Sequence, residues 1–305
     1  MLNSLIFAQS SSALEFTSGA GNPTGNGPTV ANQVITFQNN TDNPTGNAFV
    51  AYSPTTTATF SLTNQQRTML ATPNVGVMFG GGSSTSTSPV PNSLFGLLTI
   101  GAPPSSSFTS ANAASGTGID VNVNRGVYIY VTTRPLEEAG NPLPTTTTTV
   151  RYQFADMVIT FNQPVNNPII HFGGAGTNIK GASGNSILTS VEFDLITPSA
   201  TLTRLSGSNE FFTSTTSITN SASQFDAITG NGGMSGSVMV NGSNLTTVTF
   251  RIYLKAQDNE SVAGNPLYWA DSPSFTGGDV FAVGVSLNSA CNAGTVAPVI
   301  SEKTN

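Results

Sequence analysis

The chain has 305 residues, only 8% of which are charged, and it carries a formal net charge of −6. Its nine Lys and Arg residues are scattered rather than gathered in a basic stripe, which argues against binding to nucleic acid or to an anionic membrane surface. No segment has the roughly 20 apolar residues that a membrane-spanning helix needs, so we expect no membrane insertion in this segment.

The composition predicts an all-β protein. Gly (31) and Pro (18) occur throughout the chain and interrupt any helix longer than a few turns. The 18 Phe residues and the many β-branched residues favour strands. Because so few residues are charged, Ser, Thr, Asn and Gln must supply the polar surface, which is common in extracellular proteins.

The N-terminal residues 1–8 resemble the end of a signal peptide. The run from Leu5 to Ala8 is apolar and ends on a small residue, although no basic residue precedes Arg67. We interpret 1–8 as a signal-peptide remnant and expect an exported protein with an extracellular or cell-surface location.

Alternating apolar and polar residues predict short strands through the first half of the chain. Ala58 and Phe60, for example, alternate with Thr59 and Ser61. The segments between the strands are long and rich in Gly, Ser, Thr and Asn, and we interpret them as loops. Strands are expected at 33–37, 48–52, 57–62, 72–79, 94–100, 119–123 and 127–131.

The segment from Arg134 to Thr149 contains two adjacent glutamates and several prolines, and it ends in five threonines. It is either a long surface loop or a linker between two sandwiches. We favour a single large domain over 9–290, with a split near 135–149 as the alternative. Residues 291–305 are then a linker to a following module.

Two apolar runs lie at the centre of the predicted fold. The run from Met157 to Phe161 alternates with period two, and the run from Ile169 to Phe172 follows a turn that contains Pro168. We interpret them as the central pair of a β-sandwich. Later strands are expected at 187–196, 200–205, 211–218, 236–240, 246–254 and 275–287.

Strand signals about 8–12 residues apart, with turn residues between them, are the pattern of a sandwich or a barrel. The predicted fold class is therefore all-β, a jelly-roll-like antiparallel β-sandwich with long Gly/Ser/Thr/Asn-rich loops.

Few residues are candidates for nucleophilic catalysis. His171 is the only histidine, so any Ser-His-Asp or Cys-His system would have to use it. No Gly-x-Ser-x-Gly elbow is present, and we interpret His171 as a core or edge residue with satisfied hydrogen bonds. The only cysteine, Cys291, either pairs with a partner outside this segment or is a free buried thiol.

Two carboxylates have a spacing that a glycosidase pair could use. Glu192 and Asp194 are two residues apart on a predicted strand, so both point to the same side. The alternative, which we favour, is that they form the solvent face of a strand whose other face is Val191, Phe193 and Leu195.

A structural calcium ion is the one cofactor that the sequence suggests. Asp258, Asn259 and Glu260, with Asp279 later in the chain, offer the hard oxygen ligands that calcium prefers. The regular spacing of a calcium-binding loop is absent, and we expect no other cofactor.

An aromatic pair adjoins an acid where Tyr268 and Trp269 are followed by Asp271. Such a group suits sugar binding, because a ring stacks on C–H groups while a carboxylate accepts hydrogen bonds from hydroxyls. The alternative is that Trp269, the only tryptophan, is a core or rim aromatic.

Four stretches of the sequence, 58–66, 156–171, 278–287 and the tail 291–301, carry a resemblance to a known type of protein. They resemble the N-terminal domain of large, repetitive, adhesin-like cell-surface proteins of the Bacteroidetes or Flavobacteria type, and the tail resembles the join into tandem immunoglobulin-like repeats. The resemblance implies export and an adhesive role, and it supplies no site residues. Some adhesive sandwiches join a Lys to an Asn beside an acid in an isopeptide bond, and Lys255 is the candidate for such a bond here.

We therefore expect a non-enzymatic, secreted or cell-surface module with a structural or adhesive role. The alternative is a carbohydrate-binding, lectin-like module that uses Tyr268, Trp269 and nearby acids. The expected partners are a surface glycan, a protein ligand or neighbouring domains of the same long chain.

Overall fold

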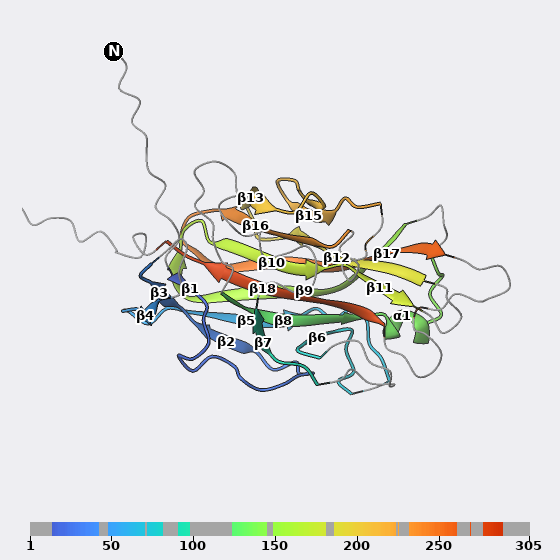
Figure 1. Cartoon of the computed structure of the whole chain (residues 1–305), viewed down its shortest axis with the longest axis horizontal. Helices are drawn as coiled ribbons and strands as arrows, with labels where there is room; N and C mark the ends of the chain where they lie inside the picture. Colours follow the sequence, from blue (N-terminus) through green and yellow to red (C-terminus); the bar gives the residue numbers. More distant parts are fainter. Residues whose placement is uncertain are drawn as a thin grey trace, which may run out of the picture.

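A computed structural model describes residues 14–42, 48–70, 72–81, 91–97, 124–144, 149–180, 186–223, 225, 232–260, 269 and 277–288. These residues form three antiparallel sheets and one five-residue helix, α1 (Arg134–Glu138). The two large sheets run along the length of the molecule (Figure 1), and residues from both contribute to one hydrophobic core. The predicted all-β, sandwich-like fold class is confirmed.

The larger sheet has eight strands in the order β14-β15-β12-β17-β9-β5-β2, with β11 paired to β12. Its longest strands, β9 and β17, have 16 residues each and pair over most of their length. The strands are β2 (Gln33–Thr36), β5 (Thr57–Thr63), β9 (Val150–Val165), β11 (Thr177–Lys180), β12 (Ser186–Leu195), β14 (Phe211–Thr213), β15 (Ser217–Asn220) and β17 (Leu245–Glu260).

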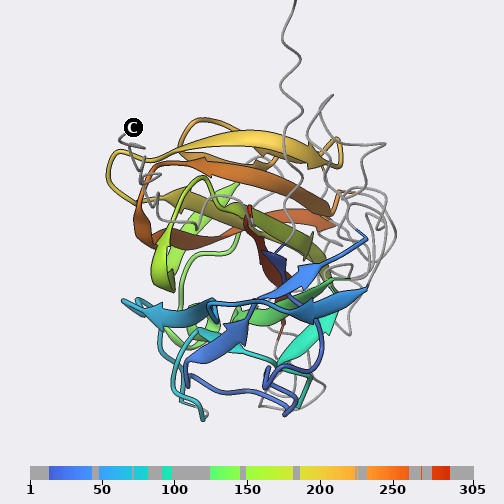
Figure 2. The same cartoon turned by 90° about the vertical axis from the view of Figure 1, so that its left-hand side faces the viewer.

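The second sheet has seven strands in the order β13-β16-β10-β18-β8-β6, with β7 paired to β8. In Figure 2 the early strands, coloured blue, lie at one end of the sandwich, and the yellow and orange strands lie at the other. The strands are β6 (Val77–Phe79), β7 (Phe95–Leu97), β8 (Arg125–Thr132), β10 (Ile169–Ala175), β13 (Thr201–Gly207), β16 (Met234–Asn241) and β18 (Gly278–Ser286).

A small third sheet has the order β1-β3-β4, formed by β1 (Leu14–Glu15), β3 (Gln38–Asn40) and β4 (Phe49–Ala51). Leu14 also exchanges two backbone hydrogen bonds with Leu287, just after β18, with N···O distances of 3.0 and 2.9 Å. The beginning and the end of the described fold therefore lie side by side.

The alternation in β9 explains how its sequence builds one wall of the core. Met157, Ile159 and Phe161 are buried, whereas Thr160 and Asn162 on the other face of the strand are exposed. Aromatic rings fill the space between the sheets and connect them. The ring centroid of Phe172 on β10 lies 4.4 Å from that of Phe193 on β12, which in turn lies 5.3 Å from that of Phe281 on β18.

Strands from the early and late parts of the chain pair within both large sheets. β5 pairs with β9, and β8 pairs with β18. A split into two sandwiches near 135–149, the alternative left open by the sequence, does not fit this pairing. The segment expected to be a loop there contains α1, in which Pro135 and Leu136 are buried.

The runs interpreted as a central strand pair, β9 and β10, lie in different sheets rather than beside each other. β10 continues into β11 after the single residue Gly176, and this step takes the chain from the seven-stranded sheet into the eight-stranded sheet. Gly176 has a φ of +128°, and a Cβ there would lie 3.2 Å from the Cα of Gly233. A glycine therefore fits this crossover better than any other residue.

Candidate functional site

A buried carboxylate lies on the outer side of the eight-stranded sheet, where Glu192 of β12 is only 2% exposed. Its Oε2 accepts a hydrogen bond from Nε of Arg151 on β9 at 2.9 Å, and its Oε1 lies 3.1 Å from Nζ of Lys255 on β17. Two cations from neighbouring strands thus compensate one buried negative charge, which is the condition under which a buried carboxylate is tolerated.

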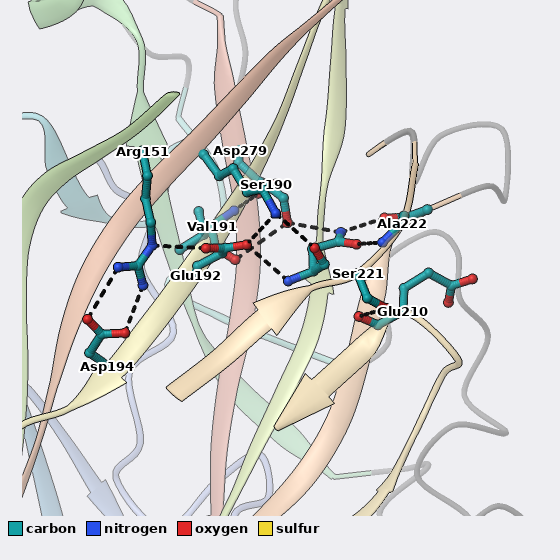
Figure 3. A network of polar contacts seen from close by, with 12 residues as sticks. Arg151, Ser190, Val191, Glu192, Asp194, Glu210, Ser221, Ala222 and Asp279 are labelled. Atoms are coloured by element: carbon teal, nitrogen blue, oxygen red, sulfur yellow. Dashed lines mark hydrogen bonds and ion pairs between the residues drawn. The ribbon is translucent and has the colours of Figure 1, made fainter. Parts of the chain in front are cut away.

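The guanidinium of Arg151 lies between two carboxylates (Figure 3). Besides Glu192, it contacts Asp194 through Nη2 at 2.8 Å and Nη1 at 3.3 Å. Its central carbon also lies 3.5 Å from the ring centroid of Tyr253, a cation–π contact.

This arrangement corrects both interpretations of Glu192 and Asp194. The guanidinium of Arg151 binds both carboxylates, so the two do not face each other across a free space as a glycosidase pair does. The pair does not form a solvent face either, because only Asp194 is partly exposed and Glu192 is buried.

Lys255 contacts both residue types that the isopeptide hypothesis requires. Its Nζ contacts Glu192 and donates to the backbone oxygen of Asn220 at 3.1 Å. The side-chain amide of Asn220 is engaged elsewhere, because its Nδ2 donates to Ser190 Oγ at 3.1 Å and to Gly232 O at 2.6 Å. The network therefore acts as a polar brace across β12, β15 and β17, and the isopeptide bond stays a hypothesis.

The carboxylate of Asp279 points from β18 toward the opposite sheet and is 1% exposed. It accepts hydrogen bonds from the backbone N–H of Gly176 and, at 2.8 Å, from that of Val191 on β12. Burial is the larger effect and raises the pKa of Asp279 to about 7, although the backbone hydrogen bonds to the carboxylate act in the opposite direction. These donors give Asp279 a structural role at the sheet crossover.

The predicted calcium site lies mostly outside the residues that the structure describes, and it stays a prediction. The side chains of Asp258, Asn259 and Glu260, at the end of β17, lie outside the described part, whereas Asp279 bonds to backbone N–H groups. Within the described ranges, no group of three or more His, Cys, Asp or Glu could hold a metal ion.

His171 occupies the outer side of β10, between two serines of the flanking strands. Its Nδ1 lies 2.7 Å from Ser237 Oγ on β16, and its Nε2 lies 2.7 Å from Ser286 Oγ on β18. The side chain is 1% exposed, and burial lowers the pKa of His171 to about 3, so the ring is neutral near pH 7. Both ring nitrogens are satisfied by hydroxyls, as the structural interpretation of His171 predicts.

Trp269 is part of the core, with 1% of its surface exposed. Its Nε1 donates to the backbone oxygen of Asn141 at 3.0 Å, and its ring makes an edge contact with Tyr152 at 5.5 Å between centroids. The exposed stacking platform that sugar binding requires is therefore not formed by Trp269, and its alternative role as a core aromatic fits. The other two predicted ligand-binding residues, Tyr268 and Asp271, lie outside the described residues, as does Cys291.

The outer side of the eight-stranded sheet also carries an uncharged surface, which we call the hydroxyl face. One row across it pairs Thr59 with Val34 on one side and with Thr160 on the other, and Thr160 in turn pairs with Thr247. The hydroxyl face consists of Val34, Thr36, Thr57, Thr59, Ser61, Val158, Thr160, Asn162, Ile196, Thr247 and Thr249.

A second row lies next to the first, with Val158 opposite both Ser61 and Thr249, and with Ile196 joined to Thr249 by a backbone hydrogen bond.

Every residue of the hydroxyl face is partly or fully exposed; the exposed fraction is 49% for Val34 and 36% for Ile196. The hydroxyls of its Thr and Ser residues make no hydrogen bond with any group in the described part of the chain. They are free to contact an external partner.

Charged residues begin in the row beyond. There, Arg251 Nε donates to Asp156 Oδ1 at 2.9 Å, so the charges at this border are paired with each other. The outer side of the sheet is therefore divided into a charged, braced part around Glu192 and an uncharged part that is open to solvent.

No pattern in the sequence identifies the hydroxyl face by itself. The sequence contains a partial signal of an exposed hydroxyl row, in the Thr-x-Thr-x-Ser pattern of 57–61 and the Thr-x-Thr pattern of 247–249. Only the strand register, however, shows that these residues lie beside Thr160 on one surface.

Comparisons with protein-family models, with curated proteins and with solved structures give no match. Within the residues that the structure covers, no helix has the length and apolar character to span a membrane. The functional interpretation therefore depends on the chain's own geometry.

Proposed function

We propose that this chain is a non-enzymatic, secreted or cell-surface module with a structural or adhesive role, and that it attaches to an extended surface through the hydroxyl face. The observation that carries the proposal is the exposed, uncharged array of hydroxyl and methyl groups around Thr59 and Thr160, whose hydroxyls lack partners in the described chain.

The polar groups that could serve catalysis are engaged in structural contacts. Glu192 is bound by two cations, Asp279 by backbone N–H groups and His171 by two serines. A general acid or base must reach its substrate, and these three side chains are each at most 2% exposed. Their burial supports a role in holding the scaffold.

The proposal is tested by measuring retention of the purified chain on a panel of extended surfaces: ice, crystalline cellulose, chitin and fixed cells. The variant Thr160→Lys places a charge at the centre of the hydroxyl face, and Thr219→Lys places one on β15, a strand of the charged brace on the same sheet. Retention on at least one surface that is lost in Thr160→Lys and kept in Thr219→Lys supports the proposal. Retention on none of them contradicts it, and so does polysaccharide turnover that Glu192→Gln abolishes.

A further inference from the structure

The strand register places the residues of the hydroxyl face in rows that run in two directions. Neighbouring strands of a sheet lie about 4.8 Å apart, and side chains on one face of a strand repeat about every 6.8 Å. Thr59, Thr160 and Thr247 follow the first direction, and Thr57, Thr59 and Ser61 follow the second. The exposed hydroxyls and methyls therefore form a grid and not an irregular patch.

We propose that the hydroxyl face binds the surface of crystalline ice, an inference that rests on the proposed attachment function. Ice presents a rigid, uncharged lattice of hydrogen-bonding oxygens with repeats of similar size to those of a β-sheet. Threonine hydroxyls can take positions in such a lattice, and the β-branched methyls of Val34, Val158 and Ile196 fill the spaces between them without competing for hydrogen bonds.

The charge distribution supports this choice of partner. The hydroxyl face itself carries no charge, and the nearest charged row is internally neutralised, with Arg251 paired to Asp156. A neutral lattice does not require the desolvation of an ion on the protein, whereas a phosphate or an anionic surface would need a cation that this face lacks.

The residue types argue against the other partners. Sugars are recognised by aromatic stacking, and protein interfaces are enriched in aromatic residues, Met and Arg, but none of these residues occurs in the hydroxyl face. The grid is also stiff, because Phe60, Ile159 and Val248 anchor the same strands in the core, each with 0% exposure. A stiff array loses little conformational entropy when it binds a rigid partner.

The inference is tested by growing ice slowly in a solution of the full chain and measuring the fraction of protein taken into the ice, together with the freezing-point gap during crystal growth. Wild type and Thr219→Lys are expected to enter the ice and to show a gap. Thr160→Lys, and Thr247→Lys as a second variant, are expected to lower both quantities severalfold. Denaturant unfolding of each variant checks that the fold is kept, as expected for positions that are partly or fully exposed.

The outcomes separate this inference from the proposed function. Exclusion of the wild type from ice overturns the inference, and uptake that Thr160→Lys leaves unchanged overturns the assignment to this face. Retention on cellulose, chitin or cells that depends on Thr160, without uptake into ice, overturns the inference while the attachment function stands.

Discussion

Asp279 on β18 accepts hydrogen bonds from the backbone N–H of Gly176, with distances of 3.0 Å to Oδ1 and 2.9 Å to Oδ2, where the chain passes between the two large sheets. The same carboxylate accepts from the N–H of Val191, which lies between the segments of β12 that pair with β11 and with β15. A buried N–H without a partner costs about 1–3 kcal/mol, so Asp279 stabilises the crossover by satisfying both donors.

Asp279 is expected to make the protein less stable as pH rises from about 4 to 7. Burial raises its pKa to about 7, above the ordinary 3.8, so in this range the folded state keeps a proton that the unfolded chain has released. Its contribution to the free energy of unfolding is full below pH 4 and falls as pH rises toward 7. Urea unfolding at a series of pH values should show that the wild type loses stability relative to Asp279→Asn as pH rises over this range. An unchanged pH profile in the variant would identify another group as its source.

His171 is expected to act in the opposite direction. Burial lowers its pKa to about 3 from 6.5, so the folded state binds fewer protons than the unfolded chain between these values. Its contribution is full above about pH 6.5 and is lost as pH falls toward 3. The two effects oppose each other in the wild type, so Asp279→Asn should become more stable with rising pH over 4–6.5. His171→Gln should become less stable over the same range, and parallel profiles for the two variants would contradict this assignment.

Glu192→Gln is expected to lower the free energy of unfolding by about 2–3 kcal/mol, because it leaves Arg151 and Lys255 without their shared buried carboxylate. Asp194→Asn is the matched control. Asp194 contacts the same guanidinium but has 32% of its side chain exposed, so its loss should cost under about 1 kcal/mol. Chemical denaturation of both variants checks the difference, and equal losses would mean that burial does not distinguish the two ion pairs.

Trp269→Ala is expected to destabilise the fold by about 3–5 kcal/mol, since it removes a large core side chain that is 1% exposed. Trp269→Phe should recover part of this loss, because it keeps a ring beside Tyr152 but loses the hydrogen bond to Asn141. The measurement is again the denaturation midpoint. A midpoint unaffected by Trp269→Ala would favour the surface role that a sugar-stacking tryptophan requires.

The strands of this fold are largely readable from the sequence, because alternation reports which side of each strand is buried. Met157, Ile159 and Phe161 are an example, as all three lie in the core. The pairing of strands is not readable in the same way. The chain brings Thr59 beside Thr160 across about a hundred intervening residues, and no local pattern encodes that register.

The polar residues show a similar limit. Alternation correctly places Glu192 on the side of β12 opposite Val191, but it cannot tell an open surface from one that Arg151 and Lys255 cover. In the same way, residue type groups Asp279 with Asp258 and Glu260, whereas its hydrogen-bond partners in the structure are backbone N–H groups, which have no signature in the sequence.

The bridge between Leu14 and Leu287 has a mechanical consequence. A force that pulls these two residues apart acts first on the two backbone hydrogen bonds between them, and the rest of the sandwich lies outside this force path. As long as these two hydrogen bonds hold, the load does not pass through the core, and the outer face of the eight-stranded sheet keeps its geometry.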